Sequence, residues 1–520
     1  MAVFKDILNS PYAVHGLCVA LLTVLISAFW QDLADELPHP RIPLFGKKRW
    51  DFFNKNAKAC FTTSARQLIL DGFATGVNIF QVMSNGPLIV IHPKFIDEIK
   101  NHSHLSFAAA IQKMFFYNRI PGFEPFHAGN GGQALVDMVR TKLTQSLGVL
   151  MAPLSEEGAR VVEEILPPSS DWKVYTFATY IPYIIARMST RAFLGRELAQ
   201  NEDWIHVSVT YSIDAFHAAR ELRQWPSILR PVVYRFLSSV HKIQKSKALG
   251  TAILDKEVQR RKTIRCSQVP TESVSCPADT LDWMNDICHE MNLAIDMFDR
   301  QMALSLAAIH TTSNLFTNIM YDLAVHPELI QPLRDEIRLA FTEDGYLKKT
   351  TLIKLKLMDS VMKETQRVNP ISFVTMNRLA GVNIPLSNGI VIPKGAAIGV
   401  SAHINYDESV YPDAAEYDGY RFYKKRQVPG SEQRFQFVTT SPESFGFGHG
   451  THACPGRFFA TNEAKILLVH LLLKYDWKLK NGDKRPPNIE HGTDIIADPT
   501  VEMLFRSREP DIDLAALEGR

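Results

Sequence analysis

The sequence predicts a mainly α-helical domain with small β-sheets, preceded by an N-terminal transmembrane helix. Three observations support this fold class. An apolar stretch without charged residues lies close to the N-terminus, helical patterns dominate residues 133–324, and short runs of strand-forming residues next to turn signals occur near residues 76–91 and 389–401. Helices therefore form most of the domain, and the strands form minor sheets.

The apolar stretch is Pro11–Trp30, which contains no Asp, Glu, Lys or Arg. Twenty residues at helical rise span about 30 Å, the thickness of a bilayer core. A cleaved signal peptide is the alternative, but the end of this run lacks a small-residue cleavage site. Lys47–Arg49 favour a cytosolic C-terminal body. We therefore expect a membrane anchor over 1–31, a proline-rich linker over 32–46 and the folded domain over 47–520.

The composition excludes several classes of protein. With 46% hydrophobic and 22% charged residues in 520, the chain can form a large packed core. A formal charge of +2 argues against nucleic acid as the main partner. The six cysteines form no C-x-x-C pair, so neither a disulfide framework nor a zinc site is indicated. The cysteines are Cys18, Cys60, Cys266, Cys276, Cys288 and Cys454.

Turn signals define the predicted strands and loops. A strand pair is expected over residues 76–91, with its turn at Ser84–Pro87, and a hairpin over Gly389–Ser401, with its turn at Pro393–Gly395. Phe107–Phe126 is predicted to be an aromatic loop that packs on the core or borders a ligand. Gly492–Pro499 is predicted to be a tight apolar turn. The basic cluster at residues 260–265 is interpreted as a solvated loop, with docking of an acidic redox partner as the alternative.

Asp299–Ala324 is apolar nearly all round, which predicts a long buried helix. Ala307 and Ala308 in its middle are small and would leave room for a ligand beside the helix. Thr311 follows directly in the same stretch. The alternative is a structural helix in which threonine hydroxyls bond to backbone carbonyls one turn earlier.

The strongest chemical signal is Cys454, which lies in a glycine-rich loop before an apolar helical run. Glycines let the backbone turn tightly and approach a ligand closely. Backbone N–H groups and the positive end of the following helix would stabilise a thiolate, and Pro455 suits the first turn of that helix. The two interpretations are a thiolate metal ligand and a buried structural cysteine.

The loop also resembles a family motif. The run Phe447-Gly448-His449-Gly450-Thr451-His452-Ala453-Cys454-Pro455-Gly456 fills every fixed position of F-G-x-G-x-[R or H]-x-C-x-G, the haem-binding loop of the cytochromes P-450. The resemblance implies that Cys454 is the axial thiolate of haem b and that His452 meets a haem propionate. It implies further cofactor-binding positions at Phe447, Gly448, Gly450, Gly456, Arg140 and Arg378. In the family, the position of Val136 is often a tryptophan.

Two more segments match the family. The resemblance implies that Glu364, Arg367 and Arg421 form a buried structural triad, and that Thr311 helps to deliver protons to iron-bound oxygen. Ala308 and His310 depart from the family pattern, since these positions are usually glycine and an acid. A histidine there would make proton delivery sensitive to pH near neutrality, because imidazole titrates in that range. His310 is therefore a second catalytic candidate.

The resemblance covers nearly the whole chain from about residue 40, and its motifs occur in the family's order. It implies a microsomal monooxygenase of the fungal secondary-metabolite type, in the endoplasmic reticulum with its catalytic domain facing the cytosol. Electrons would come from NADPH through a flavoprotein reductase, and O2 and a lipophilic small molecule would be substrates. A terpenoid, indole-terpenoid or polyketide intermediate is expected. The alternatives are isomerisation, dehydration or peroxygenase-like chemistry on the same fold, and a haem-binding sensor or carrier without turnover.

Overall fold

The computed structural model describes residues 15–16, 18–19, 22–23, 37–48, 50–51, 54–117, 119–127, 130–225, 229–267, 279–292 and 296–513. Apart from a few scattered positions, the predicted anchor at Pro11–Trp30 lies outside them. None of the helices formed by the described residues has both the length and the apolar character needed to cross a membrane.

Helices form most of the described chain, as the sequence predicts. Their bounds are α3 Lys55–Ala74, α4 Ile96–Ile99, α5 Phe107–Met114, α6 Asn130–Met138, α7 Leu147–Ile165, α8 Ile181–Phe193, α9 Arg196–Ala199, α10 Glu202–Gln224, α11 Arg230–Val233, α12 Ser238–Ser267, α13 Thr280–Glu290, α14 Met297–Val325, α15 Ile330–Asp344, α16 Lys349–Lys354, α17 Lys356–Val368, α18 Arg421–Arg426 and α19 Arg457–Lys474. A π-helical segment, Val139–Leu143, follows α6 directly.

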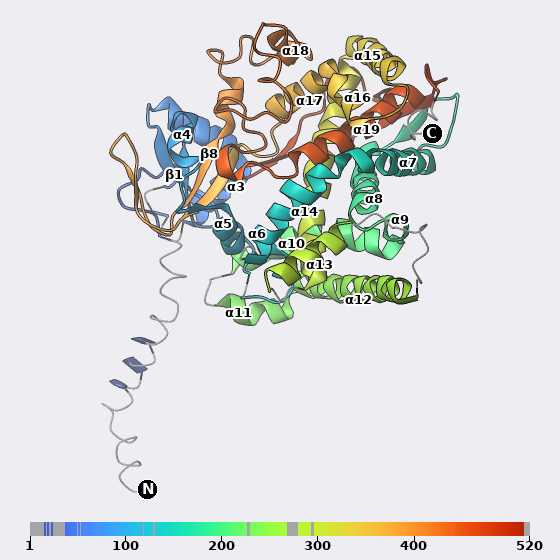
Figure 1. Ribbon diagram of the computed structural model, residues 1–520. Helices are drawn as coiled ribbons and strands as arrows, with labels where there is room; N and C mark the ends of the chain where they lie inside the picture. Colours follow the sequence, from blue (N-terminus) through green and yellow to red (C-terminus); the bar gives the residue numbers. More distant parts are fainter. Residues whose placement is uncertain are drawn as a thin grey trace.

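The strands form four small sheets. Their bounds are β1 Ile79–Met83, β2 Pro87–Ile91, β3 Leu105–Ser106, β4 Lys173–Tyr175, β5 Val374–Ala380, β6 Ile384–Pro385, β7 Val391–Ile392, β8 Ala397–Ser401, β9 Tyr475–Leu479, β10 Ile489–His491, β11 Asp494–Ile496 and β12 Met503–Ser507. The largest sheet has the order β1-β2-β8-β5-β3. Figure 1 shows β1 and β8 beside α3 and α4 on one side of the molecule, with the helical body on the other.

The long helix α14 confirms the helix predicted over residues 299–324 and runs through the middle of the helical body (Figure 1). The Asp296 side chain caps its N-terminus by accepting hydrogen bonds from the N–H groups of Phe298 and Asp299. Side chains of α14, α7, α8, α10 and α19 share the main hydrophobic core. Because most of α14 is buried against other helices, its residues have fixed positions for most of its length.

The strand pair near residue 80 is confirmed, but the predicted hairpin over Gly389–Ser401 is wrong. β1 and β2 pair antiparallel. In contrast, β7 pairs with β6, while β8 lies between β2 and β5 in the largest sheet. The turn around Gly395 does form, with φ +81°, and its N–H bonds to the carbonyl of Ala380. The turn directs the chain from one sheet into another because the apolar β8 is stabilised by burial in the larger sheet.

Two predicted loops contain helices instead. Phe107–Phe126 begins with α5, which is capped by Ser106 through a hydrogen bond to the N–H of Ala109. The basic cluster lies on α12 rather than in a solvated loop. Arg261 donates to Glu257 at 2.7 Å and to Asp279 at 2.7 Å, so part of the charge in this cluster is neutralised by acids.

Candidate active site

The cysteine loop is held by its own backbone. The N–H of Cys454 donates to the carbonyl of Phe447 at 2.8 Å, and the N–H of Ala453 donates to that of Gly450 at 3.0 Å. The ring of Phe447 packs edge-on against Phe437, with 4.9 Å between centroids. These contacts give the loop a defined shape.

Two of the loop glycines are required by geometry. Gly448 has φ +68° and Gly450 has φ +77°, values that side-chain-bearing residues rarely adopt. A Cβ on Gly450 would also lie 2.6 Å from the Asn101 side-chain oxygen. Gly456 differs, since its φ is −87° and its nearest neighbour would lie 3.9 Å from a Cβ. The predicted need for tight turning therefore holds at Gly448 and Gly450 and not at Gly456.

The electrostatics at Cys454 suit a bound cation. Burial raises the pKa of its thiol, while the backbone N–H groups of Gly456 and Arg457 and the Arg457 charge lower it. Arg457 is the first residue of α19, so these donors belong to the positive end of that helix. The prediction that Pro455 stands in the first turn of this helix is wrong, because Pro455 precedes Gly456, the residue that caps α19. A desolvated sulfur with N–H donors becomes a stable thiolate when a metal ion supplies the missing positive charge.

Beside the loop lies a group of cationic side chains. Arg378 is 3% exposed, and its Nη1 donates to the carbonyl of Asn377 at 2.7 Å. Burial lowers the pKa of Arg378 to about 10. The pKa of His452 is lowered first by burial and then by the charges of Arg378 and Arg140. His452 therefore lies close enough to both arginines for their charges to disfavour its protonation.

The cationic group lacks its counter-charge. Among the described residues, no carboxylate forms an ion pair with Arg378 or Arg140, and the buried Nη2 of Arg378 has no hydrogen-bond partner. A buried donor without a partner costs free energy, so the arrangement is complete only with an anion present. Haem propionates are anions of the required kind. The residues present therefore fit a haem whose iron is bound by Cys454.

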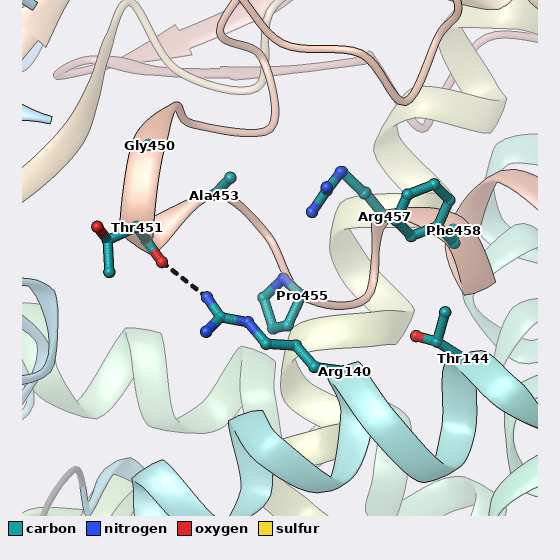
Figure 2. Close-up of a pocket in the computed structure, with 8 residues that line it drawn as sticks. All are labelled: Arg140, Thr144, Gly450, Thr451, Ala453, Pro455, Arg457 and Phe458. Carbon is teal, nitrogen blue, oxygen red and sulfur yellow. Dashed lines mark hydrogen bonds between the residues drawn. The ribbon is translucent and has the colours of Figure 1, made fainter. Parts of the chain in front are cut away.

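Arg140 stands at the edge of this group. It lies in the π-helical segment and donates from Nη2 to the carbonyl of Thr451 at 2.7 Å (Figure 2). It borders a cavity of about 350 Å³ next to the cysteine loop. The lining residues are Arg140, Thr144, Gly450, Thr451, Ala453, Pro455, Arg457 and Phe458.

On α14, Ala307 and Thr311 are exposed although Ile309 and Thr312 are buried. The two exposed residues are four apart, so they share one face of the helix. The Thr311 hydroxyl donates to the Ala307 carbonyl at 2.7 Å, which is the back-bonded geometry named as the structural alternative. Solvent-accessible space therefore adjoins α14 at the stretch where the sequence predicted room for a ligand.

His310 is directed elsewhere. Its Nε2 lies 3.0 Å from the carbonyl of Val209, which belongs to α10. Burial lowers the pKa of His310, and the Val209 hydrogen bond raises it less. The imidazole is therefore neutral at physiological pH and bridges α14 to α10, whereas Thr311 faces the accessible space.

Glu364, Arg367 and Arg421 meet in a buried cluster. The Glu364 carboxylate accepts two hydrogen bonds from Arg367, at 2.9 and 2.7 Å, and one from Arg421 at 3.0 Å. The N–H of Asp418 donates to the same carboxylate at 3.0 Å. Backbone carbonyls accept the remaining guanidinium donors, so the charges are fully hydrogen-bonded. The three residues predicted as a triad are brought together.

Sequence reasoning missed Asn314, which lies one turn after Thr311 on α14. Its side-chain nitrogen donates to the Ile495 carbonyl at 3.0 Å, and its oxygen accepts from the Ala497 N–H at 2.8 Å. These bonds attach the β10–β11 hairpin to the helix. The tight turn predicted over Gly492–Pro499 is confirmed only at its start, where Gly492 has φ +59°, because residues 494–496 form strand β11. Nothing in the local sequence marks Asn314, because its partners are distant in the chain.

A cysteine in a loop of N–H donors, a cationic group lacking an anion, and a long helix with an accessible face together define a haem-thiolate protein. The chain belongs to the cytochrome P450 family, since the family model "Cytochrome P450" matches residues 77–504.

Curated relatives agree over nearly the full length. The chain is 37% identical over 506 residues to cytochrome P450 monooxygenase calE of Penicillium decumbens, covering 96% of this chain and 97% of the relative. It is 40% identical over 463 residues to cytochrome P450 monooxygenase trt6 of Aspergillus terreus, covering 88% and 93%. Pyr3 of Aspergillus fumigatus is 37% identical over 470 residues, covering 90% and 89%.

Among solved structures, retinoic-acid-bound cyanobacterial CYP120A1 matches with a TM-score of 0.63 at 17% identity, covering 90% of this chain and all of that one. This likeness supports the fold. The protein is therefore an enzyme of the cytochrome P450 monooxygenase type, whose cofactor is haem with a cysteine thiolate ligand and whose electrons come from a redox partner.

Proposed function

We propose that this protein is a membrane-bound monooxygenase that hydroxylates a lipophilic intermediate of fungal secondary metabolism, in one or more steps. NADPH supplies the electrons through a flavoprotein reductase. The observation that carries the proposal is the accessible face of α14 at Ala307 and Thr311 in an otherwise buried helix. The fungal cytochrome P450 monooxygenases at 37–40% identity support the proposed role in fungal secondary metabolism.

Exposed apolar side chains on elements attached to α14 favour an apolar substrate. Ile371 and Ile496 lie where the hairpin held by Asn314 meets the chain, Phe216 lies on α10, and these side chains are 39%, 47% and 44% exposed. A terpenoid, indole-terpenoid or polyketide skeleton would cover these side chains and gain their burial free energy, about 25 cal/mol per Å². The substrate pocket is assigned to the region that these residues and Thr311 border.

Each site residue has a proposed task. The haem, when bound, supplies the activation of O2, and Cys454 holds it through the thiolate. Arg378 and His452 hold its propionates, with Arg140 at the edge. The Thr311 hydroxyl moves a proton after it leaves the Ala307 carbonyl, which needs only a rotation about one bond. His310 can take part only through Nδ1, because its Nε2 is engaged with Val209.

Membrane attachment rests on the charge-free run Pro11–Trp30. Val232 and Phe236, which are 53% and 79% exposed, offer a further apolar contact with a bilayer. We expect the full chain to remain with endoplasmic reticulum membranes after alkaline carbonate extraction, and a chain lacking residues 1–31 to be released. A full chain that is released by carbonate would contradict the anchor.

The function is tested with the full chain in microsomes together with a P450 reductase. The reduced carbon monoxide complex should give the family's red-shifted Soret band, and Cys454→Ala should abolish it. Phe458→Ala, a change at an exposed side chain in the first turn of α19, is the matched control and should keep the band. Persistence of the band in Cys454→Ala would contradict the ligand assignment.

Isomerisation, dehydration or peroxygenase-like chemistry on the same haem-thiolate fold is the second candidate. It is favoured by the two departures on α14, Ala308 and the neutral His310. Oxygen uptake that requires both NADPH and reductase, and that matches product formation, would decide for monooxygenation. Product formed without oxygen uptake would decide for the second candidate.

A further inference from the structure

The guanidinium of Arg378 is a buried cation that no carboxylate of the described residues neutralises. The side chain is 3% exposed, its Nη1 donates to the Asn377 carbonyl at 2.7 Å, and its Nη2 has no hydrogen-bond partner. A buried charge costs free energy unless nearby groups stabilise it. The groups that surround Arg378 therefore determine where its guanidinium lies.

One of these groups is an aromatic ring. The centroid of the Phe107 ring lies 5.7 Å from the guanidinium carbon of Arg378, within the range of a cation–π contact. The face of an aromatic ring carries negative potential, which attracts a cation. The ring of Phe107 therefore supplies part of the stabilisation that a carboxylate supplies elsewhere.

The register of the largest sheet brings the ring and the cation together. Strands β3 and β5 pair antiparallel, with Ser106 opposite Leu379. One residue further along the chain, Phe107 comes opposite Arg378. Directly opposite residues of an antiparallel pair point to the same face of the sheet. The contact is thus a consequence of the strand pairing.

Phe107 is fixed at this position by its neighbours. The Ser106 hydroxyl accepts a hydrogen bond from the N–H of Ala109 at 3.1 Å, which caps α5 at its first residue, Phe107. The N–H of Gly381 donates to the His104 carbonyl at 2.8 Å, which extends the pairing of β3 with β5. Helix α5 also packs against β5. The backbone that carries the ring is therefore attached to the strand that carries Arg378.

The same stretch of chain also contacts the cysteine loop. The side-chain oxygen of Asn101 accepts hydrogen bonds from the N–H and from the hydroxyl of Thr451, each at 2.8 Å. Residues 101–107 therefore contact the cysteine loop at one end and Arg378 at the other. This stretch holds two parts of the proposed haem site in place relative to each other.

We propose that Phe107 is a positioning residue of the haem site, whose ring holds the Arg378 guanidinium where it receives a haem propionate. The proposal rests on the haem cofactor that membership of the family establishes. A long side chain whose position is already restricted loses less conformational freedom when it pairs with an anion. Loss of the ring should therefore weaken the hold of the protein on its haem.

A second effect follows from charge. A cation held beside a propionate offsets the negative charge there, which favours the reduced iron because reduction removes one positive charge. When the ring is lost and Arg378 is less well placed, the reduction potential of the haem should fall. A residue that only contacts substrate would change neither this potential nor haem retention in the absence of substrate.

The test uses the haem-loaded full chain in detergent without substrate. It measures the rate of haem transfer to excess apomyoglobin and the midpoint potential of the iron. Phe107→Leu keeps an apolar side chain but removes the ring, and it should release haem about fivefold faster and lower the potential. Phe107→Tyr keeps the ring and should stay within about twofold of the wild-type rate, with the potential unchanged.

Tyr346→Leu is the matched control, since Tyr346 is 47% exposed against 45% for Phe107 and its ring lies 4.2 Å from the Lys348 Nζ. It removes a cation–π contact away from the haem site and should change neither quantity. In an Arg378→Gln background, Phe107→Leu should have no further effect, because the ring then has no cation to hold.

A wild-type rate of haem release in Phe107→Leu overturns the proposal. So does a full effect of Phe107→Leu in the Arg378→Gln background, which would mean that the ring acts through another group. Absence of the red-shifted Soret band from the carbon monoxide complex of the unmodified protein would instead mean that the haem-thiolate assignment itself is wrong.

Discussion

Glu463 on α19 is expected to make the stability of the enzyme depend on pH. Its carboxyl group is fully buried; its oxygen Oε1 accepts a hydrogen bond from Ser189 at 2.7 Å, and Oε2 has no partner among the described residues. Burial raises the pKa of Glu463 to about 8, and the Ser189 hydrogen bond lowers it only in part. The folded protein therefore keeps a proton that the unfolded chain releases near pH 4.5.

The sign follows from proton binding. Between about pH 4.5 and 8 the folded state binds one more proton than the unfolded state, so stability is complete below this range and falls as the pH rises. Each pH unit corresponds to about 1.4 kcal/mol, so the loss amounts to about 5 kcal/mol over the whole range and about 3 kcal/mol between pH 5 and 7.5. Glu463→Gln cannot ionise and removes this loss.

The measurement is urea unfolding of the haem-loaded full chain in detergent, followed by circular dichroism at pH 5 and pH 7.5. Relative to the wild type, Glu463→Gln should gain about 3 kcal/mol between the two conditions. In Ser189→Ala, which keeps the Glu463 carboxyl, the loss of stability should extend to higher pH. The serine hydroxyl lowers the pKa of Glu463 in the wild type, and the variant lacks it. Equal pH dependence in the wild type and in Glu463→Gln would refute the reasoning, since Glu463 would then be ionised in the folded protein.

Three further predictions concern the site and its supports. Thr311→Ala should still show a substrate-induced spin shift but lose at least about tenfold in product formed per NADPH consumed, and unchanged coupling would remove Thr311 from proton delivery. Asn314→Leu deletes two hydrogen bonds, about 2 kcal/mol, and should raise KM while the Soret band of the carbon monoxide complex persists; an unchanged KM would mean that the hairpin does not position substrate. Glu364→Gln leaves two buried guanidinium groups short of charge and should cost about 3–5 kcal/mol, seen as a low yield of haem-loaded protein, whereas a normal yield would contradict a structural role.

Sequence patterns predicted the parts of the fold that depend on neighbouring residues. The helix α14 and the strand pair β1–β2 follow from periodicity and turn residues within one stretch. The strand pairing of the segment Gly389–Ser401 could not be predicted in this way. Its turn was predicted correctly, but β8 pairs with β2, which lies about 300 residues earlier in the chain. Local turn chemistry fixes the direction of the chain and does not determine which sheet a strand joins.

The same distinction applies to the site. The loop around Cys454 was predictable because the sulfur, its N–H donors and the glycines at 448 and 450 lie within one short stretch. The hydrogen bonds that join Asn314 to the β10–β11 hairpin were not predictable, since Ile495 lies 181 residues further along the chain. The direction of His310 also depends on packing, because its partner Val209 belongs to another helix.

The geometry of α14 explains how an enzyme can keep Thr311 while a histidine replaces the usual acid. Successive residues of a helix are rotated by about 100° about its axis, so the side chains of His310 and Thr311 point to different sides of α14. The imidazole joins α14 to α10 as a neutral group, whereas the Thr311 hydroxyl lies on the exposed side of the helix. Because Asn314 bonds to the β10–β11 hairpin and His310 contacts α10, both of these elements are attached to the helix that carries Thr311. The helix α14 therefore holds two neighbouring elements in place beside Thr311.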